Sequence, residues 1–557
     1  MVSIPKRLHI ACCGIFFFLS VQTVCSQDLY WITFTDKGDI SRYKNEEILT
    51  PSALENRRKK GIALDALDYP VDAEYVQGLR MLGIPVKNRS RWFNSVSAYL
   101  YEQDIYSVLQ LPFVQEVRPV SRGLRISDYD TPFSKQDVAS SDSLPFVGSY
   151  RNQLNMLGLD TLQSLGFTGS GVKVAVFDNG FYGVAEAAVF AHLFREDRVL
   201  ATRDFVDGDT NVFEPCIHCR HGTEVLSAMA GILPDQIQGS APDATYILLR
   251  TENDASEIPQ EEDNWIAAAE YADSLGAQVF STSLGYYQFD EPRFNYLPED
   301  LDGNTALITQ AGDIAASRGI IVVNSAGNTR AEEDFITNIA PPADGDSVIA
   351  VGAVDELKRR ASFSKYGPTA DGQIKPDVMA MGVQTFLVHA NGQVIRNSGT
   401  SFSCPLISGM LACVIQAKPS VSYGELYQTL IESSDRFAQP DSQYGYGIPS
   451  AMKMIGKLAP STVGTRSLLE KGRWSLFPNP GSHTFYLSTF HQSSFSQISL
   501  EIRDLQGRLM WDDTFSNVKI LEKIPFQVNL SPGIYIYMIK NYREDVYIDT
   551  GKLIIER

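Results

Sequence analysis

Residues 397–405 read Asn-Ser-Gly-Thr-Ser-Phe-Ser-Cys-Pro, a turn of small residues that leads into an apolar run with helical spacing. Gly399 permits a sharp backbone turn and the close approach of a ligand. Thr400 is expected to cap the helix, which places Ser401 at its N-terminus. Free N–H groups and the positive end of the helix dipole stabilise developing negative charge there. This setting suits a nucleophilic serine, although a turn that only caps a core helix would have the same sequence.

Two further polar residues occupy the settings that a nucleophilic serine requires. Asp178 ends a buried strand predicted at residues 172–177, and His221 opens a helix that ends before Gly231. A serine hydroxyl needs a neighbouring base, histidine exchanges protons near neutral pH, and a carboxylate selects the tautomer of the imidazole. Taken singly, Asp178 reads as a strand-end cap and His221 as a surface histidine. Together, in the order Asp…His…Ser, the three residues predict a catalytic triad.

The chain between residues 150 and 460 alternates short apolar runs with helices. This pattern is typical of a parallel α/β sheet, in which functional residues lie beyond the carboxyl ends of the strands. The predicted strands are 172–177, 245–250, 278–283, 320–325 and 348–353, and the predicted helices are 223–230, 263–275 and 305–318. Asn328 follows the fourth strand, and its side-chain amide is a candidate donor to the oxyanion of a tetrahedral intermediate.

At these positions the chain resembles the subtilisin family of serine peptidases. The resemblance extends over about residues 150–455 and rests on Asp178-Asn179-Gly180, His221-Gly222-Thr223, Ser283-Leu284-Gly285, Ser325-Ala326-Gly327-Asn328 and Gly399-Thr400-Ser401 with Pro405. It implies that Asp178, His221 and Ser401 form the triad, and that Asn328 and the backbone N–H of Ser401 bind the oxyanion. Ser283, Leu284 and Gly285 would line the substrate cleft and pair with the peptide as an added strand.

Two positions depart from the family pattern. The family has Ser or Thr where this chain has Asn179, and an Asn can still make a short hydrogen bond to the carboxylate. After the nucleophile the family has Met-Ala-Ser, whereas this chain has Phe402-Ser403-Cys404. Because an oxidisable methionine is absent there, we expect better tolerance of mild peroxide than a methionine-bearing relative shows.

The first 149 residues divide into three segments. Residues 1–26 have the charged start, apolar centre and small-residue end of a secretory signal peptide, and lipidation at Cys25 is the alternative. Residues 27–120 mix strand-like runs with helices, which predicts a compact α+β module. Residues 121–149 are rich in Ser and Asp and predict an exposed linker. By the resemblance, the module is the propeptide, which acts as folding aid and inhibitor, and the linker holds the maturation site.

Residues 473–557 change to short strands and turns, which predicts a small β-sandwich. This segment resembles the C-terminal sorting domain of proteins exported by the type IX secretion system. The matching residues are Phe477-Pro478-Asn479-Pro480, Asp504-Leu505-Gln506-Gly507-Arg508, residues 530–535 and residues 551–555. The resemblance implies a bacterium of the Bacteroidetes type, the type IX machinery as a partner, and passage through periplasm and outer membrane to a secreted or cell-surface location. An ordinary accessory β-sandwich is the alternative.

Charge and cysteine content limit the partners and the redox state. The net charge of −18 argues against nucleic acid and anionic membranes as partners and is neutral about polypeptide substrates. Export places the cysteines of the mature chain in an oxidising compartment. Cys404 and Cys413 lie on one predicted helix, about 13 Å apart by helical rise, so we expect two buried thiols rather than a disulfide between them.

The segment Cys216-Ile217-His218-Cys219-Arg220-His221 has the composition of a metal site. Zinc there would capture His221, and a C-x-x-C pair without a distant second pair is a weak signal. A Cys216–Cys219 disulfide is therefore the preferred interpretation in an oxidising compartment.

A second cluster, Asp204, Asp207 and Asp209, offers carboxylates to calcium. No complete ligand set is legible, and an exposed acidic turn is the preferred interpretation. We expect no cofactor, with a structural calcium ion as the alternative.

The whole chain predicts a secreted zymogen that hydrolyses peptide bonds through an acyl-enzyme on Ser401. Two other classes stay open. One is a catalytically silent surface or binding protein on the same fold, against which the complete triad and Asn328 argue. The other is a metal-dependent hydrolase that uses the cysteine–histidine cluster.

Overall fold

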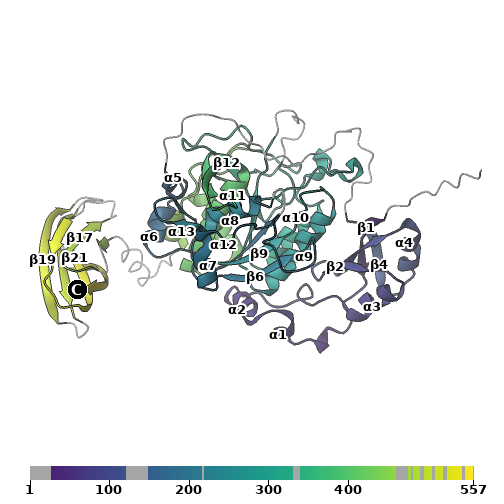
Figure 1. Ribbon diagram of the computed structural model, residues 1–557, viewed down its shortest axis with the longest axis horizontal. Coiled ribbons are helices and arrows are strands. Elements are labelled where there is room, and N and C mark those ends of the chain that lie inside the picture. Colours follow the sequence, from purple (N-terminus) through teal and green to yellow (C-terminus); the bar gives the residue numbers. More distant parts are fainter. Residues whose placement is uncertain are drawn as a thin grey trace, which may run out of the picture.

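The computed structural model describes residues 27–120, 149–215, 219–329 and 339–458, together with 474–477, 481–489, 495–504, 508–518, 524–541 and 546–555. These residues form an N-terminal α+β unit, a large α/β unit and a C-terminal all-β unit (Figure 1). The fold class expected from the sequence is confirmed for each unit. The signal peptide and nearly all of the linker expected at 121–149 lie outside the described residues.

The N-terminal unit is built on a four-stranded antiparallel sheet with the order β2-β3-β1-β4. Its elements are β1 (Asp28–Phe34), α1 (Asn45–Ile48), α2 (Pro51–Lys59), α3 (Ala73–Met81), β2 (Val86–Ser90), β3 (Ser95–Leu100), α4 (Glu102–Leu109) and β4 (Val114–Pro119). Side chains of β1 alternate between two sides of the sheet. Ile32 and Phe34 join the core of the unit itself, whereas Leu29 and Trp31 pack into a cluster of the large unit. The sheet therefore covers the large unit with one face.

A seven-stranded parallel sheet with the order β13-β12-β11-β10-β5-β9-β6 carries the large unit. Its strands are β5 (Lys173–Asp178), β6 (Val199–Asp204), β9 (Thr245–Arg250), β10 (Val279–Thr282), β11 (Ile321–Ser325), β12 (Val348–Val354) and β13 (Val378–Met381). Five of them are the strands predicted from apolar runs. The two edge strands were missed, because β6 is only half buried and β13 has one β-branched residue, Val378, and no aromatic residue.

Helices cover both faces of this sheet. They include α8 (His221–Ala230), α9 (Gln260–Ser274), α10 (Leu307–Ser317), α11 (Thr400–Ala417), α12 (Tyr423–Ser433) and α13 (Ala451–Leu458). Val174 and Val176 of β5 point to the face covered by α8 and α11, whereas Ala175 and Phe177 point to the face covered by α9 and α10. Phe177 stacks on Trp265 of α9 with ring centroids 5.1 Å apart. The strands are apolar along their whole length because both faces of the sheet are buried.

Helix α11 is the central helix of the large unit. In the part of the chain that the structure describes, it is the one helix long and apolar enough to cross a membrane, and 83% of it is buried inside the protein. Cys404 and Cys413 both lie on it as buried free thiols, as predicted. Its apolar composition therefore reflects a place in the core.

Two antiparallel sheets share one core in the C-terminal unit, which confirms the expected β-sandwich. One sheet has the order β16-β17-β20 and the other β19-β18-β21-β22. The strands are β16 (Trp474–Phe477), β17 (Thr484–Thr489), β18 (Phe495–Arg503), β19 (Leu509–Val518), β20 (Ile524–Gln527), β21 (Gly533–Asn541) and β22 (Val546–Ile555).

Candidate active site

Asp178 and His221 meet at the carboxyl edge of the parallel sheet. Asp178 is the last residue of β5 and is fully buried, and His221 is the first residue of α8. Nδ1 of His221 lies 2.8 Å from Oδ1 of Asp178. A Cβ atom on Gly222 would lie 2.2 Å from the carbonyl oxygen of Gly180, so only glycine lets α8 approach β5 this closely. The pair has the geometry of a carboxylate that orients an imidazole.

Ser401 lies in the first turn of α11 and is partly exposed. Contrary to our expectation, Thr400 is not the N-cap: Gly399 occupies that position and has no side chain with which to cap the helix. The hydroxyl of Thr400 donates instead to Oδ1 of Asn328 at 3.0 Å and accepts from the N–H of Gly327 at 3.2 Å. The side chain of Asn328 therefore replaces the local cap, because its Oδ1 atom binds both the hydroxyl and the backbone N–H of Thr400, the first residue of α11.

The segments that carry the base and the candidate nucleophile lie beside one another. Helices α8 and α11 pack together, and the ring of His221 lies 5.9 Å from the ring of Phe402, the residue after Ser401. The structure thus brings the motifs around Asp178, His221 and Ser401 to the edge formed by the carboxyl ends of the strands. Functional groups lie at this edge in parallel α/β sheets.

Asn328 follows β11 and faces the turn before Ser401. Its Oδ1 atom accepts from the N–H and from the hydroxyl of Thr400, both at 3.0 Å. These two bonds orient the amide so that its NH₂ group is the end that remains to donate. A Cβ atom placed on Gly399 would lie 3.6 Å from Nδ2 of Asn328, so the donor end lies at the nucleophile turn.

Ser283, Leu284 and Gly285 follow β10 and flank the same turn. The hydroxyl of Ser283 donates to the carbonyl oxygen of Ser401 at 2.9 Å. Leu284 is partly exposed and Gly285 is exposed. Across from Gly285 lies Ala340, 3.8 Å from the position that a Cβ would take. The exposed Gly285 lies in a segment bonded to Ser401, so this segment is the candidate for pairing with a peptide as an added strand.

Asn179 binds Asp178 and two other segments. Its backbone N–H donates to Oδ1 of Asp178 at 2.9 Å. The side-chain amide donates to Oδ1 of Asp254 at 2.9 Å, and its oxygen accepts from the N–H of Gly222 at 3.4 Å. Asn179 therefore joins β5, α8 and the loop at Asp254.

Glu224 is a polar residue of the site that our sequence analysis missed. It lies one turn after His221 on α8, is 2% exposed, and accepts from Nδ2 of Asn397 at 3.1 Å. Burial raises the pKa of Glu224, and Asn397 and His221 oppose that rise. Asn397 begins the turn that ends at Ser401, so Glu224 joins the helix of the base to the turn of the nucleophile. The sequence did carry a signal for this residue, because Glu224 is an acidic residue within a helix whose other residues are mostly apolar.

Described residues of both clusters with metal-like composition bind other protein groups. Cys219 is disulfide-bonded, whereas Cys216 and His218 lie outside the described residues, so a Cys216–Cys219 pairing stays a prediction. Arg250 binds Asp204 at 2.7 Å and Asp207 at 2.6 Å. Within the described residues no group of three potential ligands gathers. Calcium at the turn of Asp204, Asp207 and Asp209 stays untested.

Comparison with known proteins agrees with the three units. Models of the subtilase family, of the peptidase S8 propeptide domain of Bacteroidota, and of the secretion system C-terminal sorting domain match residues 169–447, 29–155 and 475–556. The serine protease AprX of Bacillus subtilis is 28% identical over 315 residues, which cover 52% of this chain and 67% of AprX. Subtilisin DY of Bacillus licheniformis is 29% identical over 294 residues, 53% of this chain and 94% of that protein. The solved structure of MycP1 without its propeptide has a TM-score of 0.43 at 22% identity and covers 56% of this chain and 98% of MycP1.

Proposed function

Since this chain belongs to the subtilase family and is a serine-type endopeptidase, we propose that it cleaves polypeptides through an acyl-enzyme on Ser401, with His221 as base and Asp178 as its orienting carboxylate. The observation that carries this assignment is the 2.8 Å contact between His221 and Asp178 beside the N-terminus of α11. The carboxylate holds the proton on Nδ1, so that Nε2 is the basic nitrogen.

In the proposed reaction His221 removes the proton of Ser401 as its oxygen attacks the scissile carbonyl carbon. The negative charge that develops on the carbonyl oxygen is bound by Asn328 Nδ2 and the backbone N–H of Ser401. His221 then gives its proton to the leaving amine, which departs and leaves an ester on Ser401. A water molecule, deprotonated by His221, attacks that ester, and the acid product leaves with regeneration of the serine. The peptide is held beside Ser283, Leu284 and Gly285.

The N-terminal unit is proposed to act as folding aid and inhibitor of the large unit. It matches a propeptide family, and it buries Leu29, Trp31 and Trp92 in a common cluster with α9 and α10. Because the sorting domain is present, the protein is exported through the outer membrane to the medium or the cell surface. The type IX machinery is the proposed partner in that step.

Hydrolysis of unfolded casein by the purified full chain, beside its Ser401→Ala variant, tests the assignment. N-terminal sequencing of both preparations tests maturation. We expect cleavage of casein and loss of the N-terminal unit in the wild type only, since loss of the serine costs about 2 × 10⁶ in turnover in subtilisin. If both preparations are equally silent after removal of the N-terminal unit, the protein is a binding module and the proposal is wrong.

A further inference from the structure

A third segment of the large unit is fixed by backbone bonds beside the proposed oxyanion site. Residues 363–365 pair antiparallel with residues 327–329. The N–H of Lys365 donates to the carbonyl oxygen of Gly327 at 3.0 Å. Asn328, the proposed oxyanion donor, is the residue after Gly327. These bonds therefore hold the backbone of Lys365 next to the site where charge develops in the proposed reaction.

The side chain of Lys365 runs from this ladder to the segment that is proposed to hold the substrate. A Cβ atom on Gly327 would lie 3.1 Å from Cδ of Lys365, so the stem of the lysine packs against this glycine. Nζ lies 3.6 Å from the centroid of the Tyr287 ring, which is a cation–π contact. Tyr287 is two residues beyond Gly285. Lys365 therefore bridges the oxyanion segment and the substrate-binding segment.

A buried amide also joins these two segments. Asn324 of β11 is 0% exposed, and its Nδ2 atom donates to the carbonyl oxygen of Leu284 at 2.8 Å. Asn324 lies four residues before Asn328 on the same stretch of chain. The separation of the two segments is thus fixed by bonds within the protein, and a side chain held between them meets a preformed site.

The proposed reaction places one substrate side chain between these segments. The attacked carbonyl has its carbon at Ser401 and its oxygen at Asn328, and the peptide runs beside residues 283–285. The side chain attached to the carbon next to that carbonyl is therefore held close to both segments. Because Lys365 bridges the same two segments, its ammonium is placed to meet the end of that side chain.

The ammonium of Lys365 gives this place a preference for charge. It has three N–H donors, so it can bind a carboxylate in addition to the groups that it already contacts. Lys365 is 2% exposed, so a carboxylate that binds it there does so away from water, and a neutral amide in the same place makes a weaker bond.

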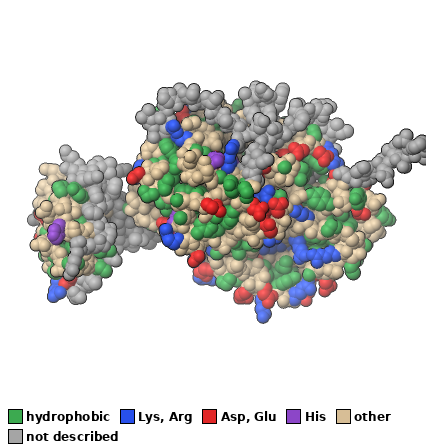
Figure 2. Space-filling model, viewed as in Figure 1, with side chains coloured by type: hydrophobic (Ala, Val, Ile, Leu, Met, Phe, Trp, Pro, Cys, Tyr) green, Lys and Arg blue, Asp and Glu red, His purple; other side chains and the backbone are tan. Residues whose placement is uncertain are grey.

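Long-range attraction does not favour acidic substrates. The net charge of the chain is −18, and Figure 2 shows small groups of acidic and of basic side chains on one face of the protein. A negative net charge repels acidic peptides as they approach. A preference for an acidic side chain would therefore have to come from a local contact such as the one with Lys365.

We propose that Lys365 is a specificity-determining residue and that the enzyme prefers an acidic residue, above all glutamate, on the amino side of the cleaved bond. This inference rests on the proposed function, because it names the substrate class of the proposed active site. Glutamate has the longer side chain of the two acids, so it reaches farther past Gly327 toward Nζ of Lys365.

The test compares peptides that differ in one residue. Internally quenched peptides carry Glu, Gln, Leu or Lys on the amino side of the scissile bond, and kcat/KM of the mature protein is measured for each. Glu and Gln have nearly the same shape, so their ratio reports the charge. We expect kcat/KM to be at least about tenfold higher for Glu than for Gln, and lowest for Lys. Equal values for Glu and Gln would overturn the proposal without any variant.

Two variants assign the preference to Lys365. Lys365→Met keeps an apolar stem over Gly327 and removes the charge, so the Glu/Gln ratio should fall to about one. Lys365→Arg keeps the charge and should keep most of the ratio. If Lys365→Met instead slows all the peptides by the same factor, Lys365 only supports the two segments and the proposal is wrong. Lys365→Gln replaces Lys365→Met if that variant does not fold.

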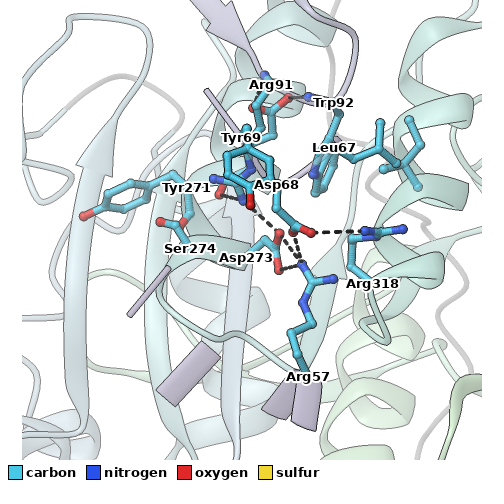
Figure 3. A network of polar contacts seen from close by, with 12 residues as sticks. Arg57, Leu67, Asp68, Tyr69, Arg91, Trp92, Tyr271, Asp273, Ser274 and Arg318 are labelled. Carbon is cyan, nitrogen blue, oxygen red and sulfur yellow. Dashed lines mark hydrogen bonds and ion pairs between the residues drawn. The ribbon is translucent and has the colours of Figure 1, made fainter. Parts of the chain in front are cut away.

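Arg318 provides a matched control at the other end of β11. It precedes this strand, whereas Lys365 binds the segment that follows it. Arg318 is 8% exposed and binds Asp68 at 3.3 Å in the buried network of Figure 3, in which Arg57 binds Asp273 at 2.8 Å. Arg318→Met also removes a buried cation, and its Glu/Gln ratio should equal that of the parent. An equal fall in the Arg318 and Lys365 variants would overturn the assignment to Lys365.

A binding measurement separates this inference from the proposed function. A recognition site for a foreign endopeptidase is inserted within residues 121–148 of the Ser401→Ala chain, and the N-terminal unit is removed after cutting. Binding of the Glu and Gln peptides is then followed by fluorescence anisotropy. If the Ser401 chain cleaves no peptide but Ser401→Ala binds the Glu peptide at least about tenfold more tightly, the proposed function is refuted and the role of Lys365 is supported. Cleavage of all the peptides without a difference between Glu and Gln would leave the proposed function intact and refute this inference.

Discussion

Nδ1 of His221 and Oδ1 of Asp178 are 2.8 Å apart, and the same oxygen accepts the backbone N–H of Asn179. This arrangement makes Asp178→Asn a sharp test. The amide keeps the size of the side chain but favours the wrong tautomer of the imidazole. We expect kcat to fall about 10⁴-fold, as for the corresponding change in another serine protease. Thermal unfolding is the control for folding, and a loss of less than tenfold in a folded variant would contradict the role of Asp178.

Asn328→Asp tests the accepting and the donating end of the Asn328 side chain separately. The remaining oxygen still accepts from the N–H and hydroxyl of Thr400, so the turn before Ser401 is retained. The donor end becomes an acceptor that repels the oxyanion. We expect kcat to fall by about 10²–10³ or more with KM nearly unchanged, the loss found when such a donor is removed from subtilisin. A raised KM at unchanged kcat would place Asn328 in ground-state binding instead.

Glu224→Gln removes a charge near His221 and retains an acceptor for Asn397. Residues three apart on a helix are neighbours, so ionised Glu224 stabilises the imidazolium form of His221. Arg220 and His389 are the other charged or titratable groups that act on Glu224. We expect the acid limb of the pH profile of kcat/KM to move down by about 0.5–1 pH unit.

Glu224→Ala is the companion variant, because it loses both the charge and the contact with Asn397. It should show the same shift and a lower kcat. A profile of Glu224→Gln that coincides with the wild type would show that Glu224 acts only as a structural residue.

Phe402 makes tolerance of peroxide testable within this chain. Phe402 and Cys404 are buried, and burial raises the pKa of Cys404 to about 12, so its thiol stays protonated and unreactive. We expect the activity of the wild type to survive mild peroxide longer than that of Phe402→Met, which restores an oxidisable side chain. Equally rapid inactivation of both proteins would contradict this, and Cys404→Ala tests whether the thiol is responsible.

The contact between the sheet of the N-terminal unit and α9 should weaken as pH rises. Asp263 accepts from Ser97 at 2.6 Å and from Asn88 at 2.7 Å, yet burial raises the pKa of Asp263 to about 6. When the units separate, the carboxyl returns toward its ordinary value of 3.8. The docked state thus binds the proton more tightly, so this stabilisation is complete below about pH 4 and is lost by about pH 6.

Asp263→Asn should make the release rate of the cut complex less dependent on pH across that window. Release is measured between pH 4 and 7 for the variant and the parent. Glu270, whose pKa burial also raises, should leave some dependence in the variant. Identical pH profiles of the two proteins would show that Asp263 keeps the same pKa in the docked and released states.

Much of the fold could be predicted from the sequence because strands and helix starts are marked by short stretches of neighbouring residues. Apolar runs identified five strands of the seven-stranded sheet, and helix-start residues placed His221 and Ser401 at helix N-termini. Strand β13 was missed because only one of its four residues, Val378, is β-branched and none is aromatic, and β6 because an edge strand is half exposed. Thr400 has the sequence of an N-cap, but a partner 72 residues away, Asn328, takes its hydroxyl.

The sequence of this chain was sufficient to predict which residue types stand at the ends of strands and the starts of helices, since those features depend on near neighbours. Their resemblance to a family then assigned roles to Asp178, His221 and Ser401. Only the tertiary structure joined Arg57 to Asp273, Glu224 to Asn397 and Ser97 to Asp263. Those contacts connect residues more than 150 positions apart, and the burial that makes them consequential comes from the packing of whole units against one another.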